Sequence, residues 1–165
     1  MKPLNEGSSV NVFICNKNNV LKILKKLKEY GEVLLEEYIP GREIQVAILE
    51  NKVLGAIELI PTRKFYDYEA KYNPKAKTKH IIPVAMSKNK YQEVTKIALK
   101  AHKILNCRGV TRSDFRFYKN KFYLLETNTQ PGMTSLSLVP EIANFNNITF
   151  KNLIKKILED ASINK

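Results

Sequence analysis

The sequence lacks the motifs and the long apolar runs that define several common classes of protein. No stretch approaches the roughly 18–20 apolar residues that a membrane-spanning helix needs, and the N-terminus has no apolar stretch typical of a signal peptide. Cys15 and Cys107 form no paired motif, so we expect reduced thiols in a cytoplasmic protein without a membrane partner. The patterns HExxH, GxSxG, CxxC and GxxxxGK[ST] are absent, which argues against a zinc protease, a serine hydrolase and a P-loop enzyme.

Acidic residues are also scarce. The 165 residues include 16 Asp and Glu against 28 Lys and Arg, a formal net charge of +12. The lysines are scattered, which is typical of solvated helix faces in a lysine-rich protein. A functional attraction for polyanionic nucleotides is the second interpretation. Nucleic-acid binding is a third, but no aromatic-interleaved basic motif supports it outside one long loop, so we expect no nucleic-acid partner.

The pattern of apolar residues predicts an α+β fold with a mainly antiparallel sheet. The length is enough for one domain or slightly more. A loop without apolar periodicity, residues 61–83, has the length of a lid or a disordered segment. We expect short strands at 10–14 and 32–39, a hairpin of 43–50 with 53–59, and helices at 18–30, at 91–105 and after Thr149.

Residues 109–128 predict a second hairpin that carries the most informative side chains. If the turn consists of the three residues 119–121, Tyr118 lies opposite Phe122. Counting outward then places Asp114 opposite Glu126 and Arg112 opposite Asn128. All four side chains share one face, because side chains alternate along a strand.

Two carboxylates that face each other across a hairpin repel, so this arrangement needs a compensating charge. A hard divalent cation with oxygen ligands would supply it, and the neighbouring arginines suggest a phosphate that shares the metal. The alternative is that Asp114 and Glu126 face solvent and pair with Arg112 and Arg116. We favour a metal–nucleotide site, because two carboxylates and the Asn128 amide suit magnesium.

Four further segments are candidates that gain weight only together. The turn at 131–138 offers backbone N–H groups for a carboxylate or an oxyanion, or is an ordinary turn into a helix. The strand at 34–39 with Glu43 could bind a purine and a ribose, or be one more amphipathic strand. Lys2 with the Gly-Ser turn at 6–9 could cover phosphates. Residues 65–72 form either a lid or a solvated tyrosine-rich loop.

The two histidines are weak candidates. His102 lies on the apolar face of a predicted helix, where a packed histidine is the usual finding. His80 lies in a basic loop with no catalytic partner at an instructive spacing.

Taken together, these segments resemble D-alanine–D-alanine ligases, which have the ATP-grasp fold. The matching runs cover nearly the whole chain in the family's order, and the third and last are very specific. They are KPLNEGSSV, LLEEYIPGREIQVAIL, FYDYEAKY, GVTRSDFR and LLETNTQPGMTSLSLVP. The resemblance implies residues 1–37 as part of the central lid subdomain and 38–165 as the C-terminal nucleotide- and metal-binding domain.

The resemblance also implies an activity. Family members use ATP to phosphorylate one D-alanine, and the amine of a second D-alanine attacks the acyl phosphate, which yields a dipeptide for peptidoglycan synthesis. Two magnesium or manganese ions accompany ATP. This agrees with the general need of phosphoryl transfer for positioning and charge neutralisation.

Carried over by resemblance, the site has four parts. The metal ligands are Asp114, Glu126 and Asn128. The ATP contacts are Lys2 and Lys71 for phosphates and Glu36, Glu37, Tyr38, Ile39 and Glu43 for adenine and ribose. The groups at the reacting centre are Arg112 and Gly132 for the tetrahedral species, with Ser8 and Tyr72 as lid contacts. The carboxylate of the second D-alanine is assigned to Ser137 and Leu138.

The sequence departs from the family in two ways. Family members are about twice this length, so we expect the chain alone to lack the ligase reaction and to need an N-terminal half or a homodimer partner. The alternative is a non-catalytic or split-partner fragment that binds ATP and magnesium. Asn11 stands where the family often has glycine.

Overall fold

The computed structural model describes residues 1–7, 9–61 and 78–161, which form two compact units. The first unit contains Met1–Ile39 with Pro61 and Thr78, and the second contains Pro40–Ile60 and the chain from Lys79 onward. None of the described helices is long and apolar enough to cross a membrane.

The first unit is built on one short helix and a two-stranded sheet. Helix α1, Val20–Leu27, continues as the 3-10 helix η1, Lys28–Tyr30, and ends at Gly31, whose φ of 72° suits glycine. This agrees with the predicted helix at 18–30. Strand β1, Lys2–Pro3, pairs antiparallel with β2, Val33–Leu34.

Of the two strands predicted in this unit, one is absent and the other is shorter than predicted. Residues 10–14 form no strand, since Ser9 and Asn11 take the positive φ values of a turn, and the backbone of Phe13 bonds to the backbone of Met1 and to Cys15 Sγ. The strand expected at 32–39 is limited to the two residues of β2. A strand needs a partner for its N–H and C=O groups, and β1 offers only two residues.

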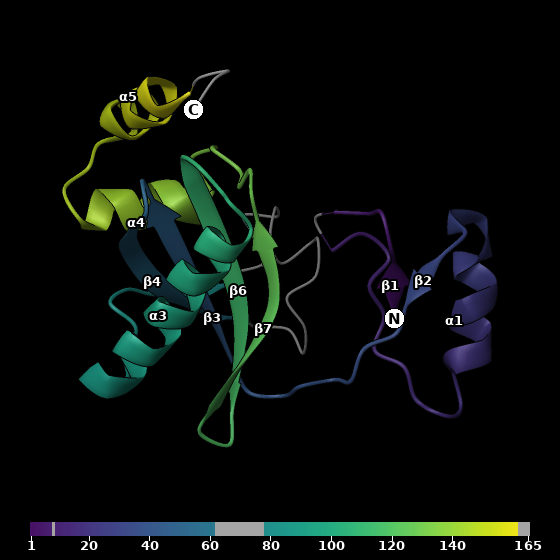
Figure 1. Ribbon diagram of the computed structural model, residues 1–165. Helices are drawn as coiled ribbons and strands as arrows, with labels where there is room; N and C mark the ends of the chain where they lie inside the picture. The colour runs from purple at the N-terminus through teal and green to yellow at the C-terminus, as the bar shows by residue number, and fades with distance from the viewer. Residues whose placement is uncertain (8, 62–77, 162–165) are drawn as a thin grey trace. The chain divides into compact units, whose positions relative to one another are not determined.

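The second unit is a five-stranded antiparallel sheet in the order β5-β4-β3-β6-β7 (Figure 1). The strands are β3, Arg42–Leu49; β4, Lys52–Ile60; β5, Lys79–Ile81; β6, Val110–Tyr118; and β7, Lys121–Asn128. Both predicted hairpins are therefore present, β3 with β4 and β6 with β7. The turn of the first comes one residue earlier than predicted, at Glu50 and Asn51.

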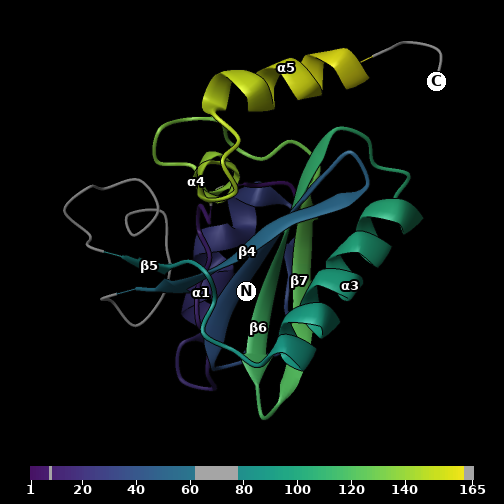
Figure 2. The same cartoon turned by 90° about the vertical axis from the view of Figure 1, so that its left-hand side faces the viewer.

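Helices cover the two faces of this sheet. Helix α3, Lys88–Ile104, packs across β3, β4, β6 and β7, whereas α4, Leu138–Phe145, packs on β4 from the other side (Figure 2). Helix α3 begins three residues before the predicted start, because Ser87 caps it by accepting the Lys90 N–H. No separate helix was predicted at 138–145, where Pro140 is tolerated because it lies in the first turn.

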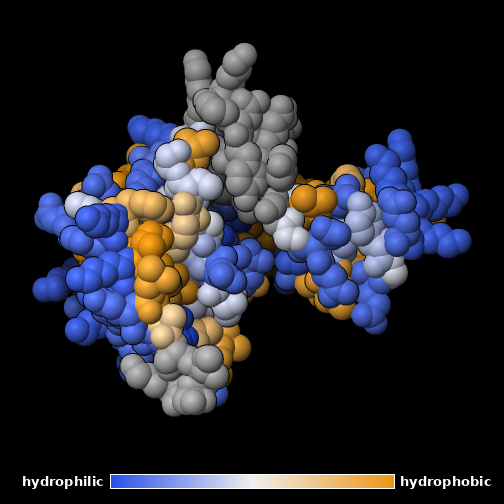
Figure 3. Space-filling view, turned by 90° about the horizontal axis from the view of Figure 1, so that it is seen from above, coloured by the Kyte–Doolittle hydropathy of each residue, from blue (hydrophilic) through white to orange (hydrophobic). Residues whose placement is uncertain are grey.

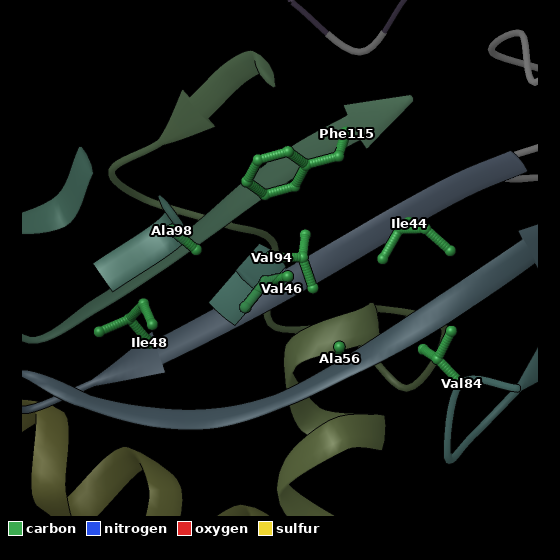
Figure 4. Packing of buried hydrophobic residues seen from close by; sticks show 8 residues of the cluster. All are labelled: Ile44, Val46, Ile48, Ala56, Val84, Val94, Ala98 and Phe115. Atoms are coloured by element: carbon green, nitrogen blue, oxygen red, sulfur yellow. The ribbon is translucent and has the colours of Figure 1, made fainter. Parts of the chain in front are cut away.

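The core of the second unit lies between α3 and one face of the sheet. Figure 4 shows side chains of β3 and α3 meeting around Phe115 of β6. Its members are buried and apolar: Ile44, Val46, Ile48, Ala56, Val84, Val94, Ala98 and Phe115. Alternate residues of β3 thus belong to this core, and the residues between them face the other side.

The last helix is peripheral. Helix α5, Phe150–Asp160, is capped by Thr149 as predicted, but only Leu153 of its apolar stripe is buried. Phe150 and Leu158 are exposed, and apolar residues are visible among hydrophilic ones on the face of the second unit shown in Figure 3. The helix predicted after Thr149 is therefore confirmed.

The β6–β7 hairpin differs from the prediction at its turn. Tyr118 pairs with Lys121, so the turn has two residues, Lys119 and Asn120, both with positive φ. The register then shifts between Phe115, opposite Leu124, and Asp114, opposite Glu126. Leu125 is therefore an extra residue, a β-bulge that restores the predicted pairing beyond it.

One buried group makes the stability of this fold depend on pH. His102 of α3 is fully buried and its Nδ1 lies 2.8 Å from Thr111 Oγ1. Burial lowers the pKa of His102 below the usual 6.5, against a smaller raising effect of Asp160; nearby Lys103 lowers it further. The neutral ring is therefore the native form.

We predict that the free energy of unfolding is highest above pH 6.5 and falls as the pH drops below it, because the unfolded chain then binds a proton that native His102 refuses. Each unit of pKa lowering corresponds to about 1.4 kcal/mol. We would measure the free energy of unfolding in urea between pH 5 and 7.5. In His102→Asn this free energy should fall less at low pH than in the unaltered chain. In the control His80→Asn it should fall as much as in the unaltered chain. An equal loss in His102→Asn would contradict the assignment.

Candidate metal and nucleotide site

The face of the sheet opposite α3 carries the residues that the sequence singles out. Arg112 pairs with Asn128 and Asp114 with Glu126, as predicted, so all four lie on one face of β6 and β7. The bulge at Leu125 is what returns Glu126 to this face, because a slip of one residue reverses the side to which every side chain points.

Asp114 is buried and held by an arginine of its own strand. Asp114 is 6% exposed, and its carboxylate oxygens accept hydrogen bonds from Arg112 Nε at 2.7 Å and from Arg112 Nη2 at 2.9 Å. This two-bond geometry is the strongest form of a carboxylate–arginine contact. The alternative interpretation thus had the right partner for Asp114 but the wrong environment, since this carboxylate does not face solvent.

Glu126 and Asn128 are linked through the asparagine amide nitrogen. Asn128 Nδ2 donates to the Arg112 carbonyl and to Glu126 Oε1, each at 3.4 Å. Because Nδ2 makes both contacts, Oδ1 is the oxygen that Asn128 would offer to a metal. Glu126 is exposed, in contrast to its partner Asp114.

The chemistry of this donor set fits a hard cation. Magnesium is usually bound by one or two carboxylates together with amide oxygens, water and phosphate. Across the described ranges no group of three or more His, Cys, Asp or Glu could hold a metal ion. That observation excludes a zinc-like cluster there, but it does not count amide oxygens, on which this site relies.

Sequence reasoning missed one residue of this face, Gln45 of β3. Gln45 pairs with Asp114 on one side and with Ile57 on the other, so it shares the face of Asp114. It is 1% exposed, and Oε1 has no hydrogen-bond partner among the residues that the structure describes. The alternation of Glu43 and Gln45 with apolar neighbours was the only signal in the sequence.

Glu43 lies next along β3 and is held by an arginine. Its Oε2 is 3.3 Å from Arg116 Nη2, and the two side chains are 11% and 12% exposed. Arg116 also donates to the Gly41 carbonyl at 3.2 Å. Arg116 therefore pairs with Glu43, not with the hairpin carboxylates that the alternative interpretation assigned to it.

The turn after β7 is folded around Ser137. Ser137 Oγ accepts from the Thr134 N–H at 2.9 Å and lies 2.9 Å from Thr134 Oγ1. A Cβ on Gly132 would come within 3.0 Å of the same oxygen, so glycine allows this close approach. Leu138, the first residue of α4, has a buried side chain, so only its backbone N–H can meet a ligand.

The site residues expected in the first unit also form a pair. Lys2 Nζ lies 2.9 Å from Glu36 Oε2, and Glu37, Tyr38 and Ile39 follow in a segment without regular structure. The other residues assigned to the site by resemblance, Ser8, Lys71 and Tyr72, lie outside the described residues.

Comparison with protein families gives one match over almost the whole chain. Residues 1–159 match the family model described as the D-ala D-ala ligase C-terminus. A D-alanine–D-alanine ligase of Pelagibacter ubique is 68% identical over 165 residues, which are 100% of this chain and 54% of that protein. One of Paramagnetospirillum magneticum is 43% identical over 98% of this chain and 54% of its own length. The chain spans about half the length of the curated relatives it matches.

Solved structures agree. A D-alanine–D-alanine ligase of Bacillus anthracis is 34% identical, with a TM-score of 0.83 over 96% of this chain and 52% of that chain. The ligase of the same organism complexed with ATP gives 27% identity and a TM-score of 0.75, over 88% and 46%. These matches confirm the predicted resemblance and the α+β, ATP-grasp fold class.

The nearly buried Glu43–Arg116 pair should make a measurable contribution to stability. We predict that Glu43→Gln lowers the free energy of unfolding by about 3 kcal/mol, because it leaves the Arg116 guanidinium uncompensated. Urea unfolding of the single variants Glu43→Gln and Arg116→Gln and of the double variant should give strongly non-additive losses. Glu159→Gln, which removes the exposed pair with Lys155, is the control and should change stability by less than about 1 kcal/mol. Additive losses at Glu43 and Arg116 would contradict the coupling.

Proposed function

The chain belongs to the D-alanine–D-alanine ligase family, and we propose that it supplies the ATP- and metal-binding part of an enzyme that joins two D-alanines. On this proposal residues 1–37 belong to the central lid subdomain and residues 38–165 to the C-terminal domain. The product, D-alanyl-D-alanine, would serve peptidoglycan precursor synthesis in the cytoplasm.

One observation carries the proposal: two opposed carboxylates and an asparagine lie on one face of the β6–β7 hairpin, in a chain whose residues 1–159 match the model of the ligase C-terminus. Like charges that face each other are costly without a cation, and among the described residues Arg112 supplies one positive charge to this pair. A site of this kind suits a metal that accompanies a triphosphate.

Asp114, Glu126 and Asn128 would hold two magnesium or manganese ions. Such ions, when bound with ATP, neutralise the charge of its phosphates. Arg112 fixes the Asp114 carboxylate through its two hydrogen bonds and, by resemblance, also faces the tetrahedral species with Gly132.

Other residues would bind the nucleotide and the amino acid. In the second unit Glu43, fixed by Arg116, would accept from ribose hydroxyls. The backbone N–H groups around Ser137 and Leu138 would bind the carboxylate of the second D-alanine. In the first unit Lys2 would contact phosphate and residues 36–39 the adenine. Ser8, Lys71 and Tyr72 are assigned by resemblance alone.

The reaction that follows has two steps. The terminal phosphoryl group of ATP passes to the carboxylate of one D-alanine and gives an acyl phosphate and ADP. The amine of the second D-alanine attacks the acyl carbon, inorganic phosphate leaves, and the amine loses a proton. The protein's contribution is to orient the three substrates and to stabilise the developing charge.

A narrower function is the alternative. In it the chain is a module that binds ATP and magnesium without ligation. The two functions make the same prediction for nucleotide binding and opposite ones for dipeptide synthesis.

Asp114→Asn should weaken magnesium-dependent ATP binding at least tenfold, because it removes a charged ligand and the negative charge that Arg112 binds. Isothermal titration calorimetry with ATP and magnesium is the measurement. Glu93→Gln is the control, since Glu93 forms an exposed pair with Lys90 on α3 and should bind as the unaltered chain does. Unchanged affinity of Asp114→Asn would remove Asp114 from the site.

Addition of D-alanine separates the two functions. We expect the 165-residue chain to bind ATP with magnesium, and to release phosphate in response to D-alanine only when the part of a full-length relative that it does not match is added. Phosphate release and D-alanyl-D-alanine, detected by mass spectrometry, are the readouts. Nucleotide binding without dipeptide under both conditions would favour the binding module.

A further inference from the structure

We propose that Gln45 is a positioning residue of the metal site, whose amide oxygen accepts a hydrogen bond from a water molecule on the magnesium ion held by Asp114 and Glu126. This inference rests on the proposed function. It adds a residue of β3 to a site otherwise built from β6 and β7.

The first support is register. Gln45 pairs with Asp114, and Asp114 pairs with Glu126, so three oxygen-bearing side chains form one row across β3, β6 and β7. Neighbouring strands are about 4.8 Å apart, so adjacent members of the row are within reach of one hydrated ion. The adjacent rows differ, because Ala47 lies beside Arg112, and Glu43 pairs with Arg116.

The second support is energetic. Gln45 is 1% exposed, and its Oε1 is buried without a hydrogen-bond partner in residues 1–7, 9–61 and 78–161. A buried acceptor in that state is unfavourable, and an apolar side chain of the same shape would remove the penalty. This unfavourable burial is explained if a bound ligand brings a hydrogen-bond donor to Gln45 Oε1.

The third support is chemistry. Magnesium keeps several of its water molecules in protein sites, and these waters are strong donors that need acceptors. A neutral amide oxygen meets that need without adding a third negative charge to a row that already has two. Groups that orient a metal's ligands in this way typically change metal affinity 10–100-fold when they are replaced.

The test is a comparison of stability with binding in Gln45→Met, which keeps the length of the side chain and removes the amide. We expect the melting temperature without ligand to be unchanged or higher, and the affinity for ATP with magnesium to fall about tenfold. The affinity for ATP in EDTA should not change. Calorimetry provides the affinities, and Mn²⁺ electron paramagnetic resonance provides the affinity for the metal alone.

Ser113→Ala is the matched control. Ser113 lies beside Asp114 on β6 but faces the other side of the sheet, where its Oγ is 2.9 Å from Thr127 Oγ1. This variant should lose about 1 kcal/mol of stability and keep its affinity for ATP with magnesium. Gln45→Glu keeps an acceptor oxygen, so it should bind Mn²⁺ at least as well as Gln45→Met and be stabilised more by magnesium.

The outcomes are distinct. Equal magnesium-dependent affinity of Gln45→Met and the unaltered chain would overturn the role of Gln45 and leave the proposed function standing. A loss that persists in EDTA would mean that Gln45 contacts the nucleotide itself, which also overturns the role assigned here. Absence of magnesium-dependent ATP binding in the unaltered chain would overturn the proposed function together with this inference.

Discussion

Repulsion between like charges is the constraint on which the second unit's functional face depends. Asp114 and Glu126 occupy neighbouring strands on one face, and Arg112 supplies a single positive charge for both. Glu43 and Arg116 neutralise each other. Among its described side chains this row therefore keeps a net negative charge, in a chain whose formal charge is +12. The net charge of the whole chain does not determine the repulsion between these two carboxylates, because interactions between distant exposed charges are screened by salt. A cation bound in the row itself relieves it directly.

The pairing of the two carboxylates was predictable, although the turn that produces it was not. The sequence suggested a three-residue turn, whereas Lys119 and Asn120 form a two-residue turn with positive φ, a conformation that matches the twist of the strands. That difference alone would have moved Glu126 to the core face. The bulge at Leu125 reverses it. Nothing in the sequence marks the bulge, since Leu124 and Leu125 are both apolar and equally exposed. The predicted pairing of Asp114 with Glu126 was right because the two deviations cancel.

Structural features that a single residue determines, such as helix ends, were predicted well. Features that depend on a partner distant in the sequence, such as the length of a strand, were not. The helix stop at Gly31 and the cap at Thr149 follow from single residues. The strand expected at 32–39 has the right composition but only two residues to pair with. Gln45 is the same kind of failure at the site: between two apolar residues it resembles a solvated strand position. Its burial is a property of the assembled sheet, which the spacing of residues along β3 does not contain.

The two faces of β3 differ in character: one face packs in the apolar core, and the other carries the polar residues of the candidate site. Ile44, Val46 and Ile48 pack against α3 in the apolar core (Figure 4), while Glu43 and Gln45 are buried on the opposite face. Burial of polar groups opposes folding, so the apolar face must offset it. A cation that binds only the folded chain adds to the stability of that chain by mass action. The gain is larger where the cation or its water satisfies polar groups that have no hydrogen bond in the ligand-free fold. On the proposed function, metal binding would be coupled to folding of this sheet, because the hydrated ion would satisfy the buried Gln45 oxygen that weakens the ligand-free fold.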